Sequence, residues 1–466
     1  MRSLCGRVAT TLTVKDAARE GRLTSLLLVD SELFAPLATY FRERNISLSA
    51  EQRYAHSLAL LLDFMDARGP EFAELEKRRE LFNAFGHAVR YGTVRDGGDP
   101  SGLWWVTRRM ETVKGLMTAA AEFSDWLVER HGAKPLNPWR SASRAEQIVF
   151  WRKWNTTRAA SMLRHIKDPG RVTTDASRAR RHGFPESVPA VTDRPPYFPH
   201  ERFDELLTRG FARPGKQNAV LPWVRYTIRD MLIAILMYAG GLRVSEAFHL
   251  FVGDVFQDPG DPALAHVRVY HPVDGEIEYR HPVTGNTVRT NRATYLQIVY
   301  QRRPLTWDGE SGWKGAMLQR GGLYRPVFWF PQDYARAFMA LYRMYLEHVR
   351  PVTVNHPWLF VTEAGEPMTP DAYKKRFATA VRRIGLRPCK AEGTTPHGLR
   401  HAYGQRIQDA VDAGQISRKE FQTAMAHRSI LSQDSYNERE AYKVQLALAK
   451  VSLANPAVAL LEEFAA

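Results

Sequence analysis

The stretch Thr395-Pro396-His397-Gly398-Leu399-Arg400-His401 is the part of the sequence that decides the fold. His397 precedes Arg400 by three residues, so both side chains lie on one face at the start of a helix. A guanidinium fork matches phosphate oxygens, and an imidazole can donate or accept a proton near neutral pH. The pair therefore suits an anionic substrate, although a histidine and an arginine at this spacing also often simply pack and hydrogen-bond.

Two further segments accompany this stretch. One is Gly241-Leu242-Arg243-Val244-Ser245-Glu246-Ala247, and the other runs from Met425-Ala426-His427 to Ser435-Tyr436. Each is ambiguous by itself, because an arginine after a helix end is often a surface residue and a single C-terminal tyrosine is often part of a core. Their order along the chain and their spacing remove much of this ambiguity.

Together the three segments resemble the tyrosine recombinase (phage integrase) family. That family carries an arginine in a G-L-R-x-S-E segment, then H-x-L-R-H, then an L-G-H-like turn with a tyrosine nine residues after its histidine. The interval from His427 to Tyr436 matches, while Met425-Ala426 replaces the commoner Leu-Gly. The resemblance covers roughly residues 199–442. It implies an enzyme that cuts and rejoins DNA through a covalent phosphotyrosine bond, with Tyr436 as the nucleophile.

The chemistry needs these residue types. A DNA phosphodiester repels an attacking oxygen until its charge is neutralised, and the forks of Arg243 and Arg400 can do this at the non-bridging oxygens. His397 can exchange a proton with the tyrosine or hydrogen-bond the phosphate, and His427 can donate to a phosphate oxygen. Nearby cations favour the phenolate of a tyrosine, whose free pKa is near 10. A covalent intermediate conserves the bond energy, so neither ATP nor another cofactor is expected.

Several alternatives stay open at this point. The resemblance suggests that Glu246 orients the site, but a carboxylate at a helix start also satisfies backbone amides. The tyrosines at 373, 403 and 442 are rival nucleophiles, although only Tyr436 has the family spacing. A metal site is not expected, because His397 and His401 at i, i+4 lack an H-E-x-x-H pattern and a third ligand.

One family element is missing from its usual position. The family places a catalytic lysine on a hairpin soon after the first arginine, where it protonates the leaving 5′ oxygen. This sequence has no lysine between Arg243 and Trp313, and the next lysine is Lys314 in Gly312-Trp313-Lys314-Gly315. If an insertion enlarges the hairpin, Lys314 can reach the site from this turn; otherwise it is a solvated lysine. Arg280 lies nearer the expected position but is a poor proton donor.

Hydrophobic periodicity predicts a mainly α protein with a small antiparallel β-sheet, an α+β class. We expect an N-terminal extension at 1–29, an all-helical core-binding domain at 30–135, a basic connector at 136–198 and the catalytic domain at 199–466. In the catalytic domain, residues 265–270 and 276–280 are expected to pair as a hairpin about Asp274-Gly275. The connector region is rich in arginine, with twelve Arg or Lys against five Asp or Glu between 139 and 195. Arg178, Arg180 and Arg181 are its candidates for contacts with a DNA backbone.

The composition agrees with a polyanionic partner. The 466 residues contain 65 Lys and Arg against 50 Asp and Glu, a formal net charge of +15, and phosphate neutralisation releases counterions. A solvated basic surface is the alternative. Two distant cysteines give no disulfide framework, and no apolar run is long enough for a signal or a membrane span. We therefore expect a cytoplasmic protein, associated with the nucleoid when bound to double-stranded DNA.

The leading hypothesis is a site-specific recombinase that integrates or excises a mobile element. The alternatives are a type IB topoisomerase or telomere resolvase with the same chemistry, and a non-catalytic DNA-binding protein of the same fold. Recombination needs four active sites around two duplexes, so we expect a tetramer on DNA, with accessory element-encoded or host proteins as further partners. An amphipathic helix at residues 440–454 is the candidate for coupling one protomer to the next.

Overall fold

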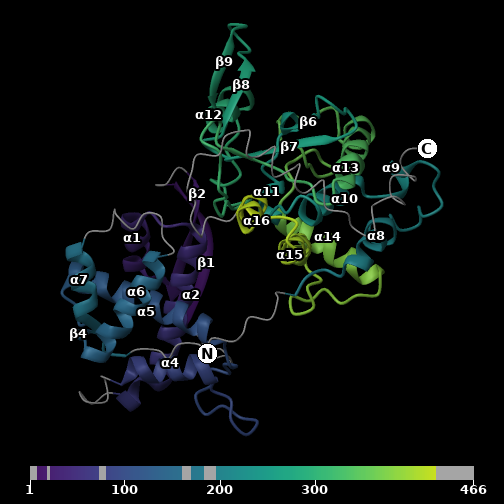
Figure 1. The fold of residues 1–466 in the computed structure, drawn as a ribbon. Coiled ribbons are helices and arrows are strands. Elements are labelled where there is room, and N and C mark those ends of the chain that lie inside the picture. The colour runs from purple at the N-terminus through teal and green to yellow at the C-terminus, as the bar shows by residue number, and fades with distance from the viewer. Residues whose placement is uncertain (1–7, 18–20, 73–79, 160–168, 183–195, 427–466) are drawn as a thin grey trace. The chain divides into compact units, whose positions relative to one another are not determined.

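The computed structural model describes residues 8–17, 21–72, 80–159, 169–182 and 196–426. The chain forms two compact units, Met1–Thr192 and Asp193–Ala466, drawn in Figure 1. Within the described residues, no helix combines the length and the apolar composition that crossing a membrane requires.

The core of the first unit is made by four helices. They are α1 (Ala35–Arg44), α2 (Leu48–Arg68), α4 (Leu81–Tyr91) and α5 (Met110–His131). The hydroxyl of Ser47 accepts from the amide of Ala50 and so begins α2, which is the usual role of serine at this position. Apolar faces of α2 and α5 pack together around Leu58, Phe64 and Val113, as the periodicity of the sequence predicts.

A three-stranded antiparallel sheet extends this unit at its N-terminal end, where the sequence pattern predicts only an extension and helices. Its strands are β1 (Ala9–Asp16), β2 (Arg22–Val29) and β3 (Glu32–Leu33), in the order β1-β2-β3. Two acidic residues of α2 hold the sheet. The carboxylate of Asp63 accepts from the amide of Ala9 at 3.1 Å, and Glu51 accepts from that of Ser25 at 3.0 Å. The strands are therefore an integral part of the first unit.

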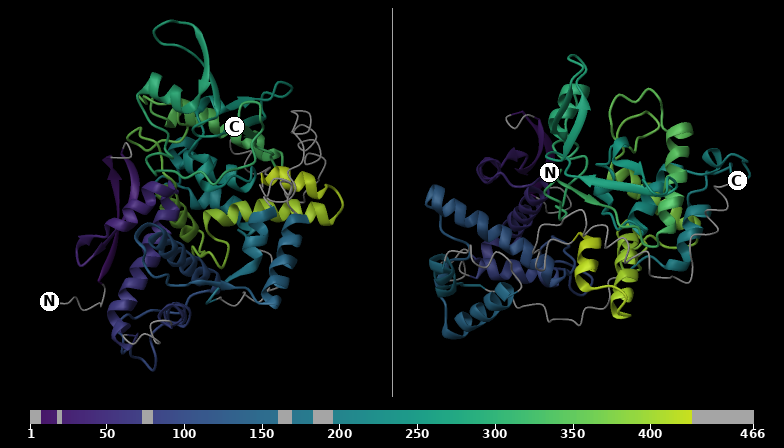
Figure 2. Two further views of the ribbon diagram at one scale, coloured as in Figure 1. Left: turned by 90° about the vertical axis from the view of Figure 1, so that its left-hand side faces the viewer. Right: turned by 45° about the horizontal axis from the view of Figure 1, so that its top comes forward.

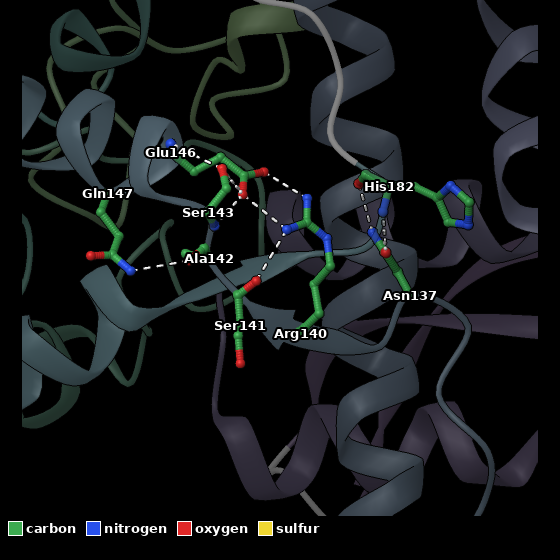
Figure 3. A network of polar contacts seen from close by, with 8 residues as sticks. All are labelled: Asn137, Arg140, Ser141, Ala142, Ser143, Glu146, Gln147 and His182. Atoms are coloured by element: carbon green, nitrogen blue, oxygen red, sulfur yellow. Dashed lines mark hydrogen bonds and ion pairs between the residues drawn. The ribbon is translucent and has the colours of Figure 1, made fainter.

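The basic segment that follows is also folded within the first unit over its described part. It contains β4 (Trp139–Ser141), α6 (Arg144–Ala159), α7 (Pro169–Ser177) and β5 (Arg178–Arg180), with β4 and β5 antiparallel. Arg140 binds Glu146 through two hydrogen bonds of 2.9 and 2.6 Å, and two bonds join Asn137 to His182 (Figure 3). These contacts give the described part of the segment a defined local structure.

The second unit is built around α10 (Ile228–Tyr238), all of whose apolar side chains are buried. Three longer helices surround its core, namely α13 (Asp333–Met344), α14 (Pro370–Arg383) and α15 (Pro396–Asp412). A three-stranded antiparallel sheet has the order β10-β7-β6, from β6 (Val255–Gln257), β7 (Ala265–Tyr270) and β10 (Tyr324–Pro326). A small sheet among many helices is the architecture that the sequence predicts.

The predicted hairpin about Asp274-Gly275 is wrong in its pairing. Residues 276–280 do form a strand, β8 (Glu276–Arg280), but β8 pairs with β9 (Thr287–Asn291), while β7 pairs with β6 and β10. The amide of Gly275 donates to the carbonyl of His271, and this tight turn leads the chain out of the β10-β7-β6 sheet. The β8–β9 hairpin then packs on α12 (Arg292–Tyr300) and projects from the body of the second unit (Figures 1 and 2).

Short elements complete the second unit. α16 (Arg418–Met425) begins with a reciprocal pair, in which the Ser417 hydroxyl accepts from the amide of Glu420 and the Glu420 carboxylate accepts from that of Ser417. The others are η3 (His200–Arg202), α8 (Phe203–Glu205), η4 (Leu206–Gly210), α9 (Pro222–Arg225), α11 (Val244–Ala247), η5 (Val252–Asp254) and η6 (Tyr345–Val349).

Candidate active site

Arg243 is placed by the sharp turn between α10 and α11. Gly241 has a φ of +65°, and a Cβ on it would lie 2.4 Å from the Tyr403 ring of α15. Only glycine therefore lets the turn pass this close to α15. The turn sets Arg243 at the N-terminus of α11, where its side chain is 21% exposed and can meet a ligand.

Glu246 connects the first arginine to the interior of the unit. Its carboxylate accepts from Arg243 Nη1 at 2.7 Å, from the Arg243 amide at 2.9 Å and from Arg325 Nη2 at 2.7 Å. Burial by itself would raise the pKa of this carboxyl, which is only 1% exposed. The positive charges of Arg325, Arg400 and Arg243 outweigh burial and hold the pKa at about 2. Glu246 is therefore the shared counter-charge of an arginine cluster.

Arg400 of α15 is the second predicted arginine, and it is 3% exposed. Its guanidinium donates to the carbonyl of Gly241 and, at 2.7 Å, to that of Met425. Burial lowers the pKa of Arg400 to about 9, with Glu246 opposing the effect and Arg325 adding to it, so the side chain stays charged at neutral pH. The two bonds tie the turn before α11 to the end of α16, and the structure thus brings two of the predicted segments and the start of the third together.

His397 stands one turn before Arg400 on α15 and is exposed. Its ring lies 4.3 Å from that of His401 in an edge-on arrangement. Partial burial of the ring, then the charges of His401, Arg400 and Lys314, lower the pKa of His397 to about 4. The imidazole is therefore neutral at pH 7 and able to accept a proton.

Lys314 is brought to the same place by a long insertion. Strands β7 and β10 are antiparallel neighbours, and residues 271–323 are inserted between them. The end of this insertion is fixed near α11 and α16. The Ser311 hydroxyl donates to the carbonyl of Ser245 at 3.2 Å, and the amide of Met317 donates to the carbonyl of Ala426 at 3.5 Å. The exposed Lys314 lies between these anchors, close enough to His397 to lower its pKa.

Arg325 is the member of the cluster that sequence reasoning misses. It is the middle residue of β10, 3% exposed, and donates to Glu246. One signal was present in the sequence, since Arg325 directly precedes the apolar run from Pro326 to Pro331. A buried charge in such surroundings needs a partner, and here the partner is Glu246.

The predicted His427 and Tyr436 lie outside the described residues, and so do Tyr442 and the segment 440–454. The description ends at Ala426, directly before His427 in sequence and directly after the Met425 carbonyl that Arg400 binds. Two rival nucleophiles are fully buried. The hydroxyl of Tyr403 donates to the carbonyl of Phe328 at 2.7 Å, and burial raises the pKa of Tyr373 well above its usual value.

The other candidates make their described contacts with residues outside this cluster. Arg280 donates to the carbonyl of Gly285 within the β8–β9 hairpin. In the first unit, Arg180 forms an ion pair with Asp125, and Arg178 forms one with Asp175. Both guanidinium groups also lie against the ring of Trp139. Arg181 uses its backbone amide to bond the carbonyl of Pro138.

The described part of the chain contains no cluster of metal-ligating side chains. Among those residues, no group of three or more His, Cys, Asp or Glu is arranged to hold an ion.

Residues 334–442 match the model of the phage integrase family. A search of curated proteins finds no match. Among solved structures, the integrase of transposon Tn1549 in complex with transposon right end DNA is 14% identical, with 93% of this chain and 99% of that one covered at a TM-score of 0.41. The XerH site-specific recombinase bound to difH substrate is 14% identical, with coverages of 91% and 80% and a TM-score of 0.42. A lambda integrase dimer bound to a COC' core site is 10% identical, with coverages of 90% and 98% and a TM-score of 0.38.

The matched segment contains the helix of His397 and Arg400 and the positions of His427 and Tyr436. Residues 334–442 of the chain are therefore similar to the phage integrase family.

Proposed function

We propose that this chain is a tyrosine recombinase that cleaves and rejoins DNA at specific sites through a 3′-phosphotyrosine intermediate on Tyr436, in the integration or excision of a mobile element. One observation carries the proposal. The charges of Arg243 and Arg400 both act on the buried carboxylate of Glu246, and those of Arg400 and Lys314 both act on His397, although these groups come from three separate regions of the sequence. This is the set of groups that attack on a phosphodiester requires.

The two arginines neutralise the phosphate in this mechanism. Arg243 is partly exposed and uses only one terminal nitrogen for Glu246 among the described contacts, so the rest of its fork can meet a non-bridging oxygen. Arg400 adds a buried positive charge beside it. Negative charge grows on those oxygens as the phosphorus becomes five-coordinate, and preorganised donors stabilise it more than they stabilise the ground state.

The covalent step exchanges one ester for another. The phenolic oxygen of Tyr436 bonds to phosphorus while the bond from phosphorus to the 5′ oxygen breaks. Neutral His397 takes the phenolic proton, and the ammonium of Lys314 protonates the departing 5′ oxygen. Rejoining reverses these transfers when a 5′ hydroxyl attacks the phosphotyrosine. His427 donates to a phosphate oxygen throughout.

The partners follow from this chemistry. Double-stranded DNA is the substrate, and the formal net charge of +15 on the chain favours such a polyanion. Four protomers assemble on two duplexes, with the segment 440–454 as the coupling element, and accessory element-encoded or host proteins assist. The protein works in the cytoplasm, on the nucleoid.

A suicide substrate tests the proposal. The substrate is a nicked duplex that loses its 5′ hydroxyl fragment after cleavage and so traps the covalent adduct. The wild-type chain is expected to form a DNA-linked peptide that contains Tyr436, and Tyr436→Phe is expected to bind DNA normally without forming it. Tyr442→Phe is the matched control and retains the adduct. An adduct in Tyr436→Phe would reject the assigned nucleophile, and no adduct with any duplex would favour a non-catalytic DNA-binding protein.

The role of Lys314 is tested by replacing the leaving oxygen with sulfur. A thiolate departs without a proton, so Lys314→Ala is expected to cleave this substrate at near the wild-type rate while failing on the normal one. Lys390→Ala serves as the control, because Lys390 also lowers the pKa of His397 but has no assigned role in proton transfer. An equal defect of Lys314→Ala on both substrates would remove Lys314 as the acid. Relaxation of plasmids without a specific site would instead indicate a type IB topoisomerase.

A further inference from the structure

Arg325 lies beside the arginine pair but has almost no access to solvent. It occupies the centre of β10, where its register partner on β7 is Val269. The side chain is 3% exposed, and its Nη2 donates to Glu246 Oε2 at 2.7 Å. Such a buried side chain does not touch DNA directly. Any effect on the reaction has to pass through Glu246.

Glu246 in turn determines how Arg243 is held. Its Oε1 atom accepts from Arg243 Nη1, and its Oε2 atom accepts both from the Arg243 amide and from Arg325 Nη2. Arg243 thus approaches the carboxylate from α11, and Arg325 approaches it from the sheet. Without the bond from β10, the carboxylate would be held only by the α11 segment that it is meant to orient.

Arg325 also has more hydrogen-bond donors than its ion pair with Glu246 uses. Within the described residues, its Nε and Nη1 atoms are buried without a hydrogen-bond partner. Leaving buried hydrogen-bond donors unpaired costs free energy, so stability alone is a poor explanation for an arginine at this position. The charges of three arginines act on the single carboxylate of Glu246, so positive charge is in excess beside Arg243, the proposed phosphate ligand.

We propose that Arg325 is a positioning residue for strand cleavage, one that clamps Glu246 and thereby holds the guanidinium of Arg243 toward the scissile phosphate. This inference rests on the proposed function, because it presumes that Arg243 binds the phosphate. It assigns to β10 a part in the reaction although the side chain of Arg325 is almost completely buried.

The test compares Arg325→Met with Arg292→Met. Arg292 is a matched control, since it is 1% exposed, is paired with the buried Asp254 and also has an unpartnered Nε among the described residues, yet has no contact with Glu246 in the structure. Single-turnover cleavage of the suicide substrate and DNA affinity are measured for both. Arg325→Met is expected to cleave about 10–100-fold more slowly with unchanged affinity, the usual scale for loss of an outer-shell partner. Arg292→Met is expected to cleave at the wild-type rate.

The pH profile separates positioning from simple loss of structure. Without the charge of Arg325, Glu246 becomes easier to protonate, so the acid limb of the cleavage rate is expected to move to higher pH in Arg325→Met. Arg325→Lys keeps the charge but not the fork, so its acid limb stays at the wild-type position while its rate is reduced. If Arg325→Met does not fold, Arg325→Lys alone decides, and a wild-type rate in that variant overturns the inference.

The outcomes distinguish the two proposals. If the wild-type chain forms no adduct, the proposed function itself fails. If the wild type forms the adduct and Arg325→Met cleaves normally, or if Arg292→Met is slowed equally, only the role of Arg325 is overturned.

Discussion

Replacing Glu246 with glutamine isolates the charge at the centre of the arginine cluster. The carboxylate accepts three hydrogen bonds and is 1% exposed. Its pKa is about 2 in the folded protein against an ordinary value of 4.5. A tenfold change in an ionisation constant corresponds to about 1.4 kcal/mol, so the ionised form favours folding by about 3 kcal/mol. Removing one partner of a buried ion pair costs a similar amount, about 3–5 kcal/mol.

The sign of the pH dependence follows from the lowered pKa. This stabilisation is complete above about pH 4.5, where the carboxyl of the unfolded chain is ionised, and it is lost as the pH falls toward 2. The difference between wild type and Glu246→Gln is therefore expected to be largest and constant near neutral pH. In that range the variant leaves three arginines without their shared counter-charge.

Hydrogen exchange on peptides of α10 is the suitable assay, because this helix lies in the core of the second unit and reports the opening of that unit alone. Glu246→Gln is expected to speed exchange there by about 10²-fold, the equivalent of about 3 kcal/mol. Glu276→Gln is the control. It removes the carboxylate of an exposed pair, with Arg289, that contributes at most about 1 kcal/mol. Exchange in Glu246→Gln that stays within a factor of about three of the wild type would refute the reasoning, because it would mean that the arginines do not depend on this charge.

Three further predictions concern other parts of the chain. Gly241→Ala is expected to destabilise the second unit by about 1–3 kcal/mol, because the new Cβ would overpack against Tyr403. Gly414→Ala is the control, since Gly414 is also at positive φ but in open space, so this variant suffers only backbone strain. Thermal melts of both variants measure the loss of stability, and equal losses would contradict the prediction. His397 is expected to remain neutral from pH 8 down to about pH 5 in the free protein, because burial and the neighbouring charges lower its pKa to about 4. NMR of labelled histidines, with His397→Gln for assignment, measures the pKa, and titration near pH 6.5 would contradict this prediction. We expect that replacing Arg178, Arg180 and Arg181 together by alanine lowers the slope of log K for DNA binding against log salt concentration. The reduction is expected to be smaller than the roughly 2.7 that three lost phosphate contacts would give, because Arg180 is paired with Asp125. A reduction of the full size would mean that this ion pair opens on DNA.

The short motifs predicted local structure that the fold contains, namely a glycine turn before Arg243 and one helical turn from His397 to Arg400. The roles of these three residues in the reaction stay predictions. The α-helices with strong apolar stripes were likewise predictable. Helix periodicity depends on neighbours three and four residues apart, which the sequence displays directly.

The strands were harder to read. The N-terminal sheet is held by Asp63 and Glu51 of α2, residues distant in sequence that only the fold brings to it. The prediction that β7 and β8 form a hairpin was wrong for a related reason. A turn signal at Asp274-Gly275 shows that the chain bends there, but which strand pairs with which depends on partners elsewhere, here β10 for β7 and β9 for β8.

The amino-acid sequence by itself therefore determined the chemistry that the protein can offer, since residue types and their spacing within a helix are local properties. Only the tertiary structure decided which distant groups lie near those residues. Lys314 is close to His397 because β10 returns the chain to β7 after the insertion, and Arg325 reaches Glu246 because both lie in the same buried interior. Electrostatic coupling depends on the distance between charges in space and on the exclusion of water. The order of residues along the chain gives neither of these directly.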